Sequence, residues 1–440
     1  MQTISLPAAR LRCVGGVSAA GLAPIVLYPL QALFTVPSLL FLAALTAMLL
    51  RHPDVAFYEI DRVAFGLLVL SVVGRAVVSR QRLFVAERAT WPMIGLTALA
   101  VASVIGQPFD HETWSLLASK FIVPFALFHL AGMVFTNERR FRQFELFALL
   151  VLAYLSFTAI AFLAGARSLI FPRFILDESL GFHADRARGP LLQAVANGVS
   201  LNMLGLLALH AYRRGSARGI KVLLLLASVP VAILATMTRA VWLSFALTIF
   251  ALLFLSRSRT LRRACVVLCL LAGLGLVAVL RSHELCRALS DRLQERGPVD
   301  YRAAVYAGSW QMFLEHPLTG WGFHQMPDAL PRYVSGYKEK VLYPHNTYLE
   351  LLVEHGVVGL ALYLWLMREI WRLGRGKIPT RERDGFLDQH FHRLWPLLLG
   401  VYWVNAAMVV MSYQFVNGLL YSVAGMLAAQ QRRAEASRPC

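Results

Sequence analysis

The sequence contains little charge and little cysteine for its length. Only 15% of its 440 residues are charged and only five are cysteines, whereas soluble globular proteins average about 25% charged residues. Four of the cysteines lie near a terminus or inside an apolar run, so Cys286 is alone in the long loop predicted below. We therefore expect no disulfide framework, because a lone thiol has no partner.

Motifs for metal-dependent or serine-based catalysis are also missing. The chain has no Asp-x-Asp, His-x-x-x-His or Cys-x-x-Cys, and the pair Asp177-Glu178 stands in no recognisable metal-ligand pattern. No serine lies in a Gly-x-Ser-x-Gly setting. We therefore expect no metal and no other cofactor.

Long apolar runs are what the sequence has instead. Hydrophobic residues make up 58% of the chain and form runs such as Val222 to Met237, Trp242 to Ser256 and Ala264 to Leu280. These runs approach the roughly twenty residues that a helix needs to cross a bilayer. One such run could be a buried core helix, but this many could not. The predicted fold class is an all-α polytopic membrane protein with about 12 transmembrane helices.

The formal net charge of +18 suggests a nucleic-acid partner, but the placement of the basic residues indicates membrane topology. They stand in short stretches between apolar runs, which is typical of cytoplasmic turns under the positive-inside rule. Nucleic-acid binders instead cluster basic residues with aromatics on a folded surface. The stretches are 80–82, 138–142, 213–214, 257–263, 372–383 and 432–433. We predict contact with membrane lipids and no nucleic-acid partner.

Placing every basic stretch inside the cell divides the chain into three parts. Residues 1–280 would contain about nine spans, with the topology of 13–50 left open because three prolines interrupt that run. Residues 281–346 would form a large periplasmic loop. Residues 347–440 would contain three further spans and a cytoplasmic basic linker at 371–385.

The loop at 281–346 is predicted to contain two amphipathic helices, separated by a break at Gly297-Pro298. Apolar side chains recur there at helical spacing, and such stripes are most often packing surfaces. The first helix would carry Leu285, Leu289 and Leu293, and the second Tyr306, Trp310 and Phe313.

The predicted topology gathers four arginines and a histidine on its outer face. Arginines near a bilayer are costly unless paired and suggest an anionic ligand, and their planar forks suit phosphate oxygens. Taken singly, each arginine could reach lipid headgroups or pair with a nearby acid, and the histidine could be structural. Together they favour displacement of a phosphate-type leaving group whose charge the arginines absorb. The set is Arg186, Arg188, Arg239, Arg302 and His345.

The end of the outer loop carries a pattern that resembles a known family. His345-Asn346, nine residues and then Gly356-Val357-Val358-Gly359 resemble the His-[Asn/Ser/Gln]-x9-Gly-x-x-Gly motif of bacterial O-antigen ligases. The spacing matches in full, and it runs from the outer loop into a membrane helix.

Three further segments resemble the wider ligase and polymerase superfamily. Residues 312–322 are similar to its "hPl-G-G" segment, and Thr238-Arg239-Ala240-Val241-Trp242 to its Thr/Ser-Arg-x-x-Trp helix start. Arg302 is similar to the arginine that opens its loop helix. The segment 186–189, with Asn197 beyond it, resembles the outer Arg-x-x-Gly region, and either arginine there could be the family's. The resemblance covers the chain from about Arg186 onward.

The resemblance implies a membrane-embedded glycosyltransferase of the GT-C type in the bacterial inner membrane, with its active site facing the periplasm. It would move a glycan from undecaprenyl pyrophosphate onto the lipid A-core oligosaccharide, without metal and with inversion. Arg239, Arg302 and one or both of Arg186 and Arg188 would bind the pyrophosphate, and His345 would be the general base or a phosphate ligand. Supporting residues would be Tyr343, Asn346, Gly356 and Gly359, the glycines by letting helices approach closely.

Other activities remain open beside this one. An O-antigen polymerase or a protein O-oligosaccharyltransferase shares the arginines and the loop, so only the full His-to-Gly spacing favours the lipid A-core acceptor. A flippase for an anionic lipid-linked sugar needs ionisable groups along a pathway and inverted repeats. Arg75 and Lys120 are the main mid-helix candidates and no repeat is visible. The sequence leaves the oligomeric state open.

Overall fold

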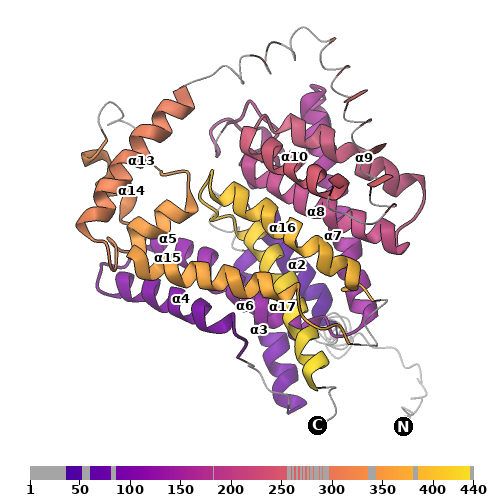
Figure 1. Cartoon of the computed structure of the whole chain (residues 1–440), viewed down its shortest axis with the longest axis horizontal. Coiled ribbons are helices and arrows are strands. Elements are labelled where there is room, and N and C mark those ends of the chain that lie inside the picture. Colours follow the sequence, from indigo (N-terminus) through magenta and orange to yellow (C-terminus); the bar gives the residue numbers. More distant parts are fainter. Residues whose placement is uncertain are drawn as a thin grey trace, which may run out of the picture.

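The computed structural model describes residues 36–51, 60–80, 86–181, 183–254, 297–334, 343–379 and 385–436, with scattered residues between 259 and 290. Within these ranges the regular structure is helical (Figure 1). The first helices are α2 (Pro37–Leu49), α3 (Ile60–Val78), α4 (Thr90–Ile105), α5 (His111–Leu117), the π-helical turn η2 (Ala118–Ile122), α6 (Val123–Val134), α7 (Glu138–Leu163), α8 (Ala194–Arg214), α9 (Ile220–Ala235) and α10 (Arg239–Phe254). The later helices are α13 (Gly297–Glu315), α14 (Met326–Ala329), α15 (Thr347–Leu373), α16 (Gln389–Ala406) and α17 (Gln414–Ala436).

The described helices fit a helical membrane protein. Four stretches are long and apolar enough to cross a bilayer, namely His111–Val134, Glu138–Leu163, Ala194–Arg214 and Thr347–Leu373. Large apolar side chains such as Leu146, Leu150 and Phe157 are more than half exposed on α7, as expected for a surface that faces lipid. The number of about twelve spans and the GT-C architecture stay predictions.

Successive helices run in alternate directions between two ends of the molecule. At one end the start of α7 meets the end of α8, where Glu138 lies 2.7 Å from Arg214. At the other end the N–H of Ala187, before α8, donates to the carbonyl of Ala235 at the end of α9 at 3.2 Å. We call the first the Arg213 end, because Arg213 lies in the last turn of α8. We call the second the His345 end, because His345 lies just before the start of α15.

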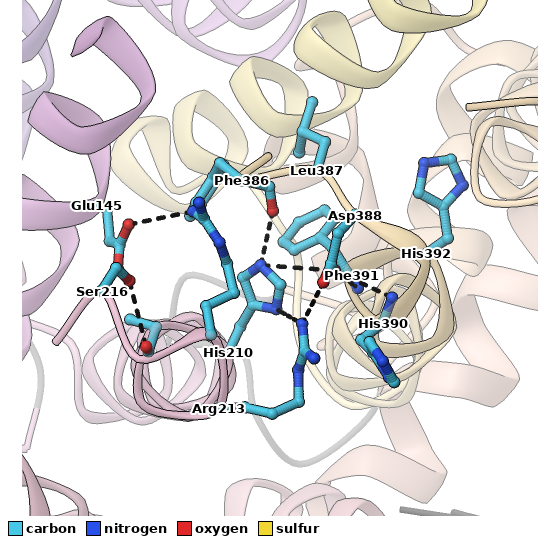
Figure 2. Close-up of polar contacts among 12 residues, drawn as sticks. Glu145, His210, Arg213, Ser216, Phe386, Leu387, Asp388, His390, Phe391 and His392 are labelled. Atoms are coloured by element: carbon cyan, nitrogen blue, oxygen red, sulfur yellow. Dashed lines mark hydrogen bonds and ion pairs between the residues drawn. The ribbon is translucent and has the colours of Figure 1, made fainter. Parts of the chain in front are cut away.

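A network of polar side chains, of which Glu145, His210 and Asp388 are buried, closes the Arg213 end (Figure 2). Its members, the Arg213 cluster, are Glu138, Glu145, His210, Arg213, Arg214, Ser216 and Asp388. Arg213 donates to Asp388, the residue that caps α16. His210, fully buried, lies with Nε2 2.6 Å from the carbonyl oxygen of Phe386. The cluster therefore fastens the segment before α16 to the end of α8 and the start of α7.

Four of the six basic stretches predicted to be cytoplasmic lie, in whole or in part, at this same end. Residues 138–142 begin α7, 213–214 end α8, 372–375 end α15 and 432–433 lie in the last turns of α17. The imidazole of His392, in the first turn of α16, lies 3.2 Å from the carbonyl oxygen of Gly374. The alternating helix directions thus place these basic stretches at the opposite end of the molecule from the predicted site residues.

Helices α6 and α17 cross in close contact at the centre of the bundle. A Cβ at Gly425 would lie 1.9 Å from the carbonyl oxygen of Phe128, and a Cβ at Gly132 would lie 3.2 Å from the carbonyl of Gly425. Only glycine permits such an approach, which is how helices commonly pack in membranes. This crossing holds α17 against the helix that continues from η2.

Several predicted features lie outside the described residues. These are the run 13–35, Cys286, and the first loop helix with Leu285, Leu289 and Leu293. Of the run from Ala264 to Leu280 only scattered residues are described. The second helix predicted in the loop 281–346 is present as α13, which packs beside α15 and α14 (Figure 1).

Candidate active site

His345 lies immediately before α15 at one end of the molecule. The next residue, Asn346, caps the helix, because its side-chain oxygen accepts the N–H groups of Tyr348 and Leu349 at 3.0 and 3.2 Å. His345 itself has a positive φ of 46°, a left-handed conformation that is uncommon for a residue with a side chain. Its ring lies edge-on to the ring of Tyr301, with centroids 5.8 Å apart. The candidate base is thus held between a helix cap and an aromatic ring.

The surroundings of His345 favour the neutral imidazole. Burial, with smaller contributions from the charges of Arg302 and His183, lowers the pKa of His345 to about 4. A histidine with that pKa carries no proton charge at pH 7 and can accept a proton. The structure therefore brings Arg302 and His345 together, as their predicted common role requires.

Arg302 lies in α13 against the turn between α16 and α17. Its Nη1 is 4.0 Å from the sulfur of Met408 in that turn. The hydroxyl of Thr347, at the start of α15, donates to the carbonyl of Val409 and accepts the N–H of Met411, at 2.8 and 2.9 Å. Helix α15 and the turn are therefore fastened together beside the guanidinium group.

Arg239 begins α10 directly after the hairpin that joins α9 to α10. The indole N–H of Trp242 donates to the carbonyl of Ile233 at 3.1 Å, which closes the hairpin. The hydroxyl of Thr238 donates to the carbonyl of Thr236 at 2.8 Å. The Thr-Arg-x-x-Trp sequence thus fixes the turn. Arg239 lies directly after this turn and is partly buried.

Arg186 and Arg188 have different surroundings although they are two residues apart. Arg188 is 1% exposed and donates to the backbone carbonyls of Ile175, Asp177 and Leu180. Burial lowers the pKa of Arg188, and the acids at 177, 178 and 185 oppose that shift. Arg186 contacts the exposed carboxylate of Asp185 at 3.5 Å. Arg188 therefore holds the loop together from within.

The loop with these arginines is joined to the start of α8. The side-chain amide of Asn197 donates to the carbonyl of Ala187 at 2.8 Å, and a Cβ at Gly189 would lie 2.9 Å from the same side chain. Gly189 has a φ of 58°, which glycine adopts readily. The Arg-x-x-Gly…Asn pattern is thus a loop anchor that brings Arg186 close to the α9–α10 hairpin.

Gly356 interrupts α15 at the point where the segment 317–322 packs against it. Gly356 has φ 63° and ψ −164°, and a Cβ there would lie 2.2 Å from the carbonyl oxygen of Leu318. The N–H groups of Trp321 and Gly322 donate to the carbonyls of Val353 and Glu354, both at 2.9 Å. The two glycine-containing motifs therefore meet as one backbone joint.

Gly359 lies one turn beyond this joint. A Cβ at Gly359 would lie 2.2 Å from the Cβ of His355, so this glycine makes room for a buried side chain of its own helix. His355 is fully buried and stacks on Phe323 with an interplanar angle of 11°. The glycine at 359 thus serves the packing between α15 and the segment that follows α13.

Two residues near His345 were missed by the sequence reasoning. His183, in the loop before α8, lies close enough to contribute to the lowered pKa of His345, and Tyr301 contacts His345 from α13. His183 stands in no recognised pattern, so only the folded loop reveals it. Tyr301 precedes Arg302 directly, and the aromatic–arginine pair at the head of a predicted loop helix could have indicated it.

Metal-ligating side chains do not gather in this region. Within the described ranges, no three of the His, Cys, Asp and Glu side chains lie close enough together to hold a metal ion. The polar groups that converge at the His345 end are instead guanidinium, imidazole and phenol groups.

Comparison with known proteins finds one family model that matches part of the chain. Residues 222–364 match the family model described as O-antigen ligase, and none of the curated proteins matches the chain. The matched part runs from α9 into α15 and contains Arg239, Arg302, His345, Gly356 and Gly359. The match supports the O-antigen ligase family for this chain, the family that the motif at His345 predicted.

Proposed function

We propose that this protein transfers a glycan from undecaprenyl pyrophosphate to the lipid A-core oligosaccharide at the periplasmic face of the bacterial inner membrane. The observation that carries the proposal is the contact of His345 with Tyr301, the residue that precedes Arg302 in α13, within the part of the chain that matches the O-antigen ligase family model. A proton acceptor and an anion-binding group side by side suit attack by a hydroxyl with loss of a phosphate leaving group.

The arginines divide into two roles in this proposal. Arg239, Arg302 and Arg186 bind the pyrophosphate and stabilise the charge that develops as the glycosidic bond breaks. Arg188 keeps the loop in shape, because its three nitrogens already donate to backbone carbonyls. The donor-binding arginine of the Arg-x-x-Gly segment is thus Arg186.

His345 acts as the general base of the transfer. It takes the proton from the acceptor hydroxyl as that oxygen forms a bond to the anomeric carbon. The bond between the anomeric carbon and the pyrophosphate oxygen breaks, and its electron pair leaves with the pyrophosphate. One displacement inverts the anomeric centre, and the chain's own side chains supply each group, so the reaction needs no metal.

The remaining residues of the predicted set support this geometry. Asn346 caps α15, Tyr343 lies beside the ring of Tyr301 with its N–H 3.4 Å from the phenol oxygen, and Gly356 with Gly359 allows the joint at segment 317–322. The His345 end faces the periplasm in this proposal, since the basic stretches gather at the opposite end, as the positive-inside rule requires of the cytoplasmic side.

The test is glycan transfer from a lipid-linked donor to lipid A-core by purified protein in detergent, without added metal and with a chelator present. Wild type is compared with His345→Ala and Arg239→Ala at matched membrane expression. The proposal expects transfer by wild type and loss of about 100-fold or more in both variants. Persistent transfer in both variants would overturn the assigned roles.

The same assay separates the related activities. Chain extension without lipid A-core indicates a polymerase, and transfer to a protein side chain indicates a protein O-oligosaccharyltransferase. Activity that appears only across a sealed bilayer indicates a flippase, because a transferase needs no second compartment.

A further inference from the structure

A lysine in η2 and two glutamates in the first turns of α15 form a buried ion-paired group near the candidate site. Nζ of Lys120 lies 2.7 Å from Oε2 of Glu350 and 3.4 Å from Oε2 of Glu354. Each of these residues is less than 10% exposed. Nζ also lies 5.6 and 5.5 Å from the ring centroids of Phe121 and Phe323. Charges in such apolar surroundings are costly, and their presence in membrane helices usually marks a function.

Glu350 connects this group to His345. It lies in the first turn of α15, and its backbone N–H donates to the carbonyl of Asn346 at 2.9 Å. Its carboxylate is held from the other side by Lys120, which lies in the π-helical turn η2, a distortion that often occurs at functional sites. The start of α15 is thus fixed to the α5–α6 helix pair by one short ion pair.

Glu354 connects the same lysine to the joint at Gly356. Its Oε1 accepts the backbone N–H of His324 at 2.9 Å, and its carbonyl accepts the N–H of Gly322 at the same distance. Lys120 therefore links η2, the head of α15 and the segment after α13. These three parts of the chain come from widely separated positions in the sequence.

The charge of Glu350 also acts on Tyr343, a residue close to the candidate base. The pKa of Tyr343, two residues before His345, is raised by burial and, to a smaller degree, by the charges of Glu112 and Glu350. The head of α15 and its ion pair are therefore close enough to act on the same groups that surround the candidate base.

We infer that Lys120 and Glu350 are positioning residues that fix the first turn of α15, and with it His345, against the α5–α6 pair. The inference rests on the proposed function, in which His345 must meet an acceptor hydroxyl at hydrogen-bond distance. Buried ion pairs add little net stability compared with apolar residues of similar size. Displacement of a catalytic group by about 1 Å can cost as much as 100-fold in rate. The role of the Lys120–Glu350 pair is therefore to position His345.

The experiment compares three replacements of Glu350 with one matched control. Glu350→Gln keeps an acceptor for Lys120, Glu350→Asp keeps the charge but shortens the side chain, and Glu350→Leu removes the contact. Glu354 still pairs with Lys120 in each variant, so no buried charge is left alone. The control is Glu369→Leu, a buried glutamate in the last turns of the same helix that pairs with Arg372 at 3.0 Å.

Two readouts are taken on full-length protein in nanodiscs. Steady-state transfer gives kcat and the KM for the lipid-linked donor, and hydrogen–deuterium exchange follows the backbone amides of residues 348–351. We expect Glu350→Leu and Glu350→Asp to lower kcat by about tenfold or more with donor KM within about twofold of wild type. Exchange at 348–351 rises in both, while Glu350→Gln and Glu369→Leu stay near wild type in both readouts.

The two proposals fail in different ways. If wild type transfers no glycan, the proposed function fails, whereas the exchange data still test the anchoring of α15. If Glu350→Asp keeps the wild-type kcat, or if exchange at 348–351 is unchanged while kcat falls, the positioning role is overturned. Equal losses in Glu350→Gln and Glu350→Leu would also overturn it, because the retained contact would then have no effect.

Discussion

The two ends of the molecule use arginine and histidine in different ways. In the Arg213 cluster each arginine meets a carboxylate, with Arg213 on Asp388 (Figure 2) and Arg214 on Glu138. At the His345 end, Arg302 has no carboxylate within ion-pair distance among the residues that the structure describes, and its polar contact is the sulfur of Met408.

This difference indicates which arginines are available to a ligand. An arginine neutralised by the protein's own carboxylate stabilises a fold junction, and binding an anion there would require breaking that pair. An arginine that faces a neutral imidazole leaves its charge for a bound anion. The comparison therefore assigns a structural role to Arg213 and Arg214 and anion binding to Arg302, whereas Arg186 would have to exchange its contact with the exposed carboxylate of Asp185 for the donor.

The largest effect is expected from removing one arginine at each end. Arg302→Ala should lower transfer by about 100-fold or more, because one group that stabilises the leaving pyrophosphate is lost. Arg213→Ala should retain transfer within about threefold but unfold at a lower temperature, because Asp388 loses its buried cation. Transfer assays and thermal unfolding on both variants, at matched expression, check the contrast. Similar losses of transfer in both variants would contradict it.

A smaller effect is expected at Arg188. Arg188→Ala leaves three carbonyl oxygens without their donor, two of them in buried hydrogen bonds, and each buried group left unsatisfied costs about 1–3 kcal/mol. The variant should therefore lose stability first, and transfer should fall only as far as the loop with Arg186 loosens. The control is Arg186→Ala, which removes a side chain that is 7% exposed and contacts the exposed carboxylate of Asp185, and whose expected signature is reduced transfer with a smaller fall in unfolding temperature than that of Arg188→Ala. If Arg188→Ala keeps full stability but loses transfer, Arg188 contacts the donor directly.

Much of this arrangement could be predicted from the sequence, since the relevant signals are local. Runs of apolar residues indicate membrane helices, and the motif from His345 to Gly359 predicted the family whose model matches residues 222–364. The fold class is supported only in its coarser form, as a helical membrane protein.

What the sequence could not reveal depends on contacts between distant segments. The different roles of Arg186 and Arg188 follow from the carbonyls of Ile175, Asp177 and Leu180, which no spacing rule places around one guanidinium group. Lys120 was noted only as a charge inside an apolar helix. Its partner Glu350 is 230 residues away, so the pair becomes visible only when α15 packs against η2.

The smallest expected effect is the pH dependence near neutrality. Because the pKa of His345 is lowered to about 4, the free enzyme already has a neutral base at pH 7, and kcat/KM should stay flat from pH 8 down to about 5. Bound pyrophosphate brings negative charge close to the ring and raises the pKa of His345. The acid limb of kcat should therefore lie at higher pH than that of kcat/KM. A limb of kcat/KM centred near 6.5 would contradict the buried, cation-flanked environment.

The same pKa shift of His345 predicts how stability changes with pH. The unfolded chain binds the His345 proton with the ordinary pKa of 6.5, whereas the folded protein binds it only near 4, so acid favours the unfolded state. This contribution is complete above pH 6.5 and is lost as the pH falls from 6.5 to 4. Thermal unfolding of wild type and His345→Gln over this range isolates it, because the glutamine variant lacks the titrating group. A wild-type curve that parallels the variant would show that the ring of His345 titrates alike in both states, and the contrast with the fully paired Arg213 cluster would then rest on Arg302 alone.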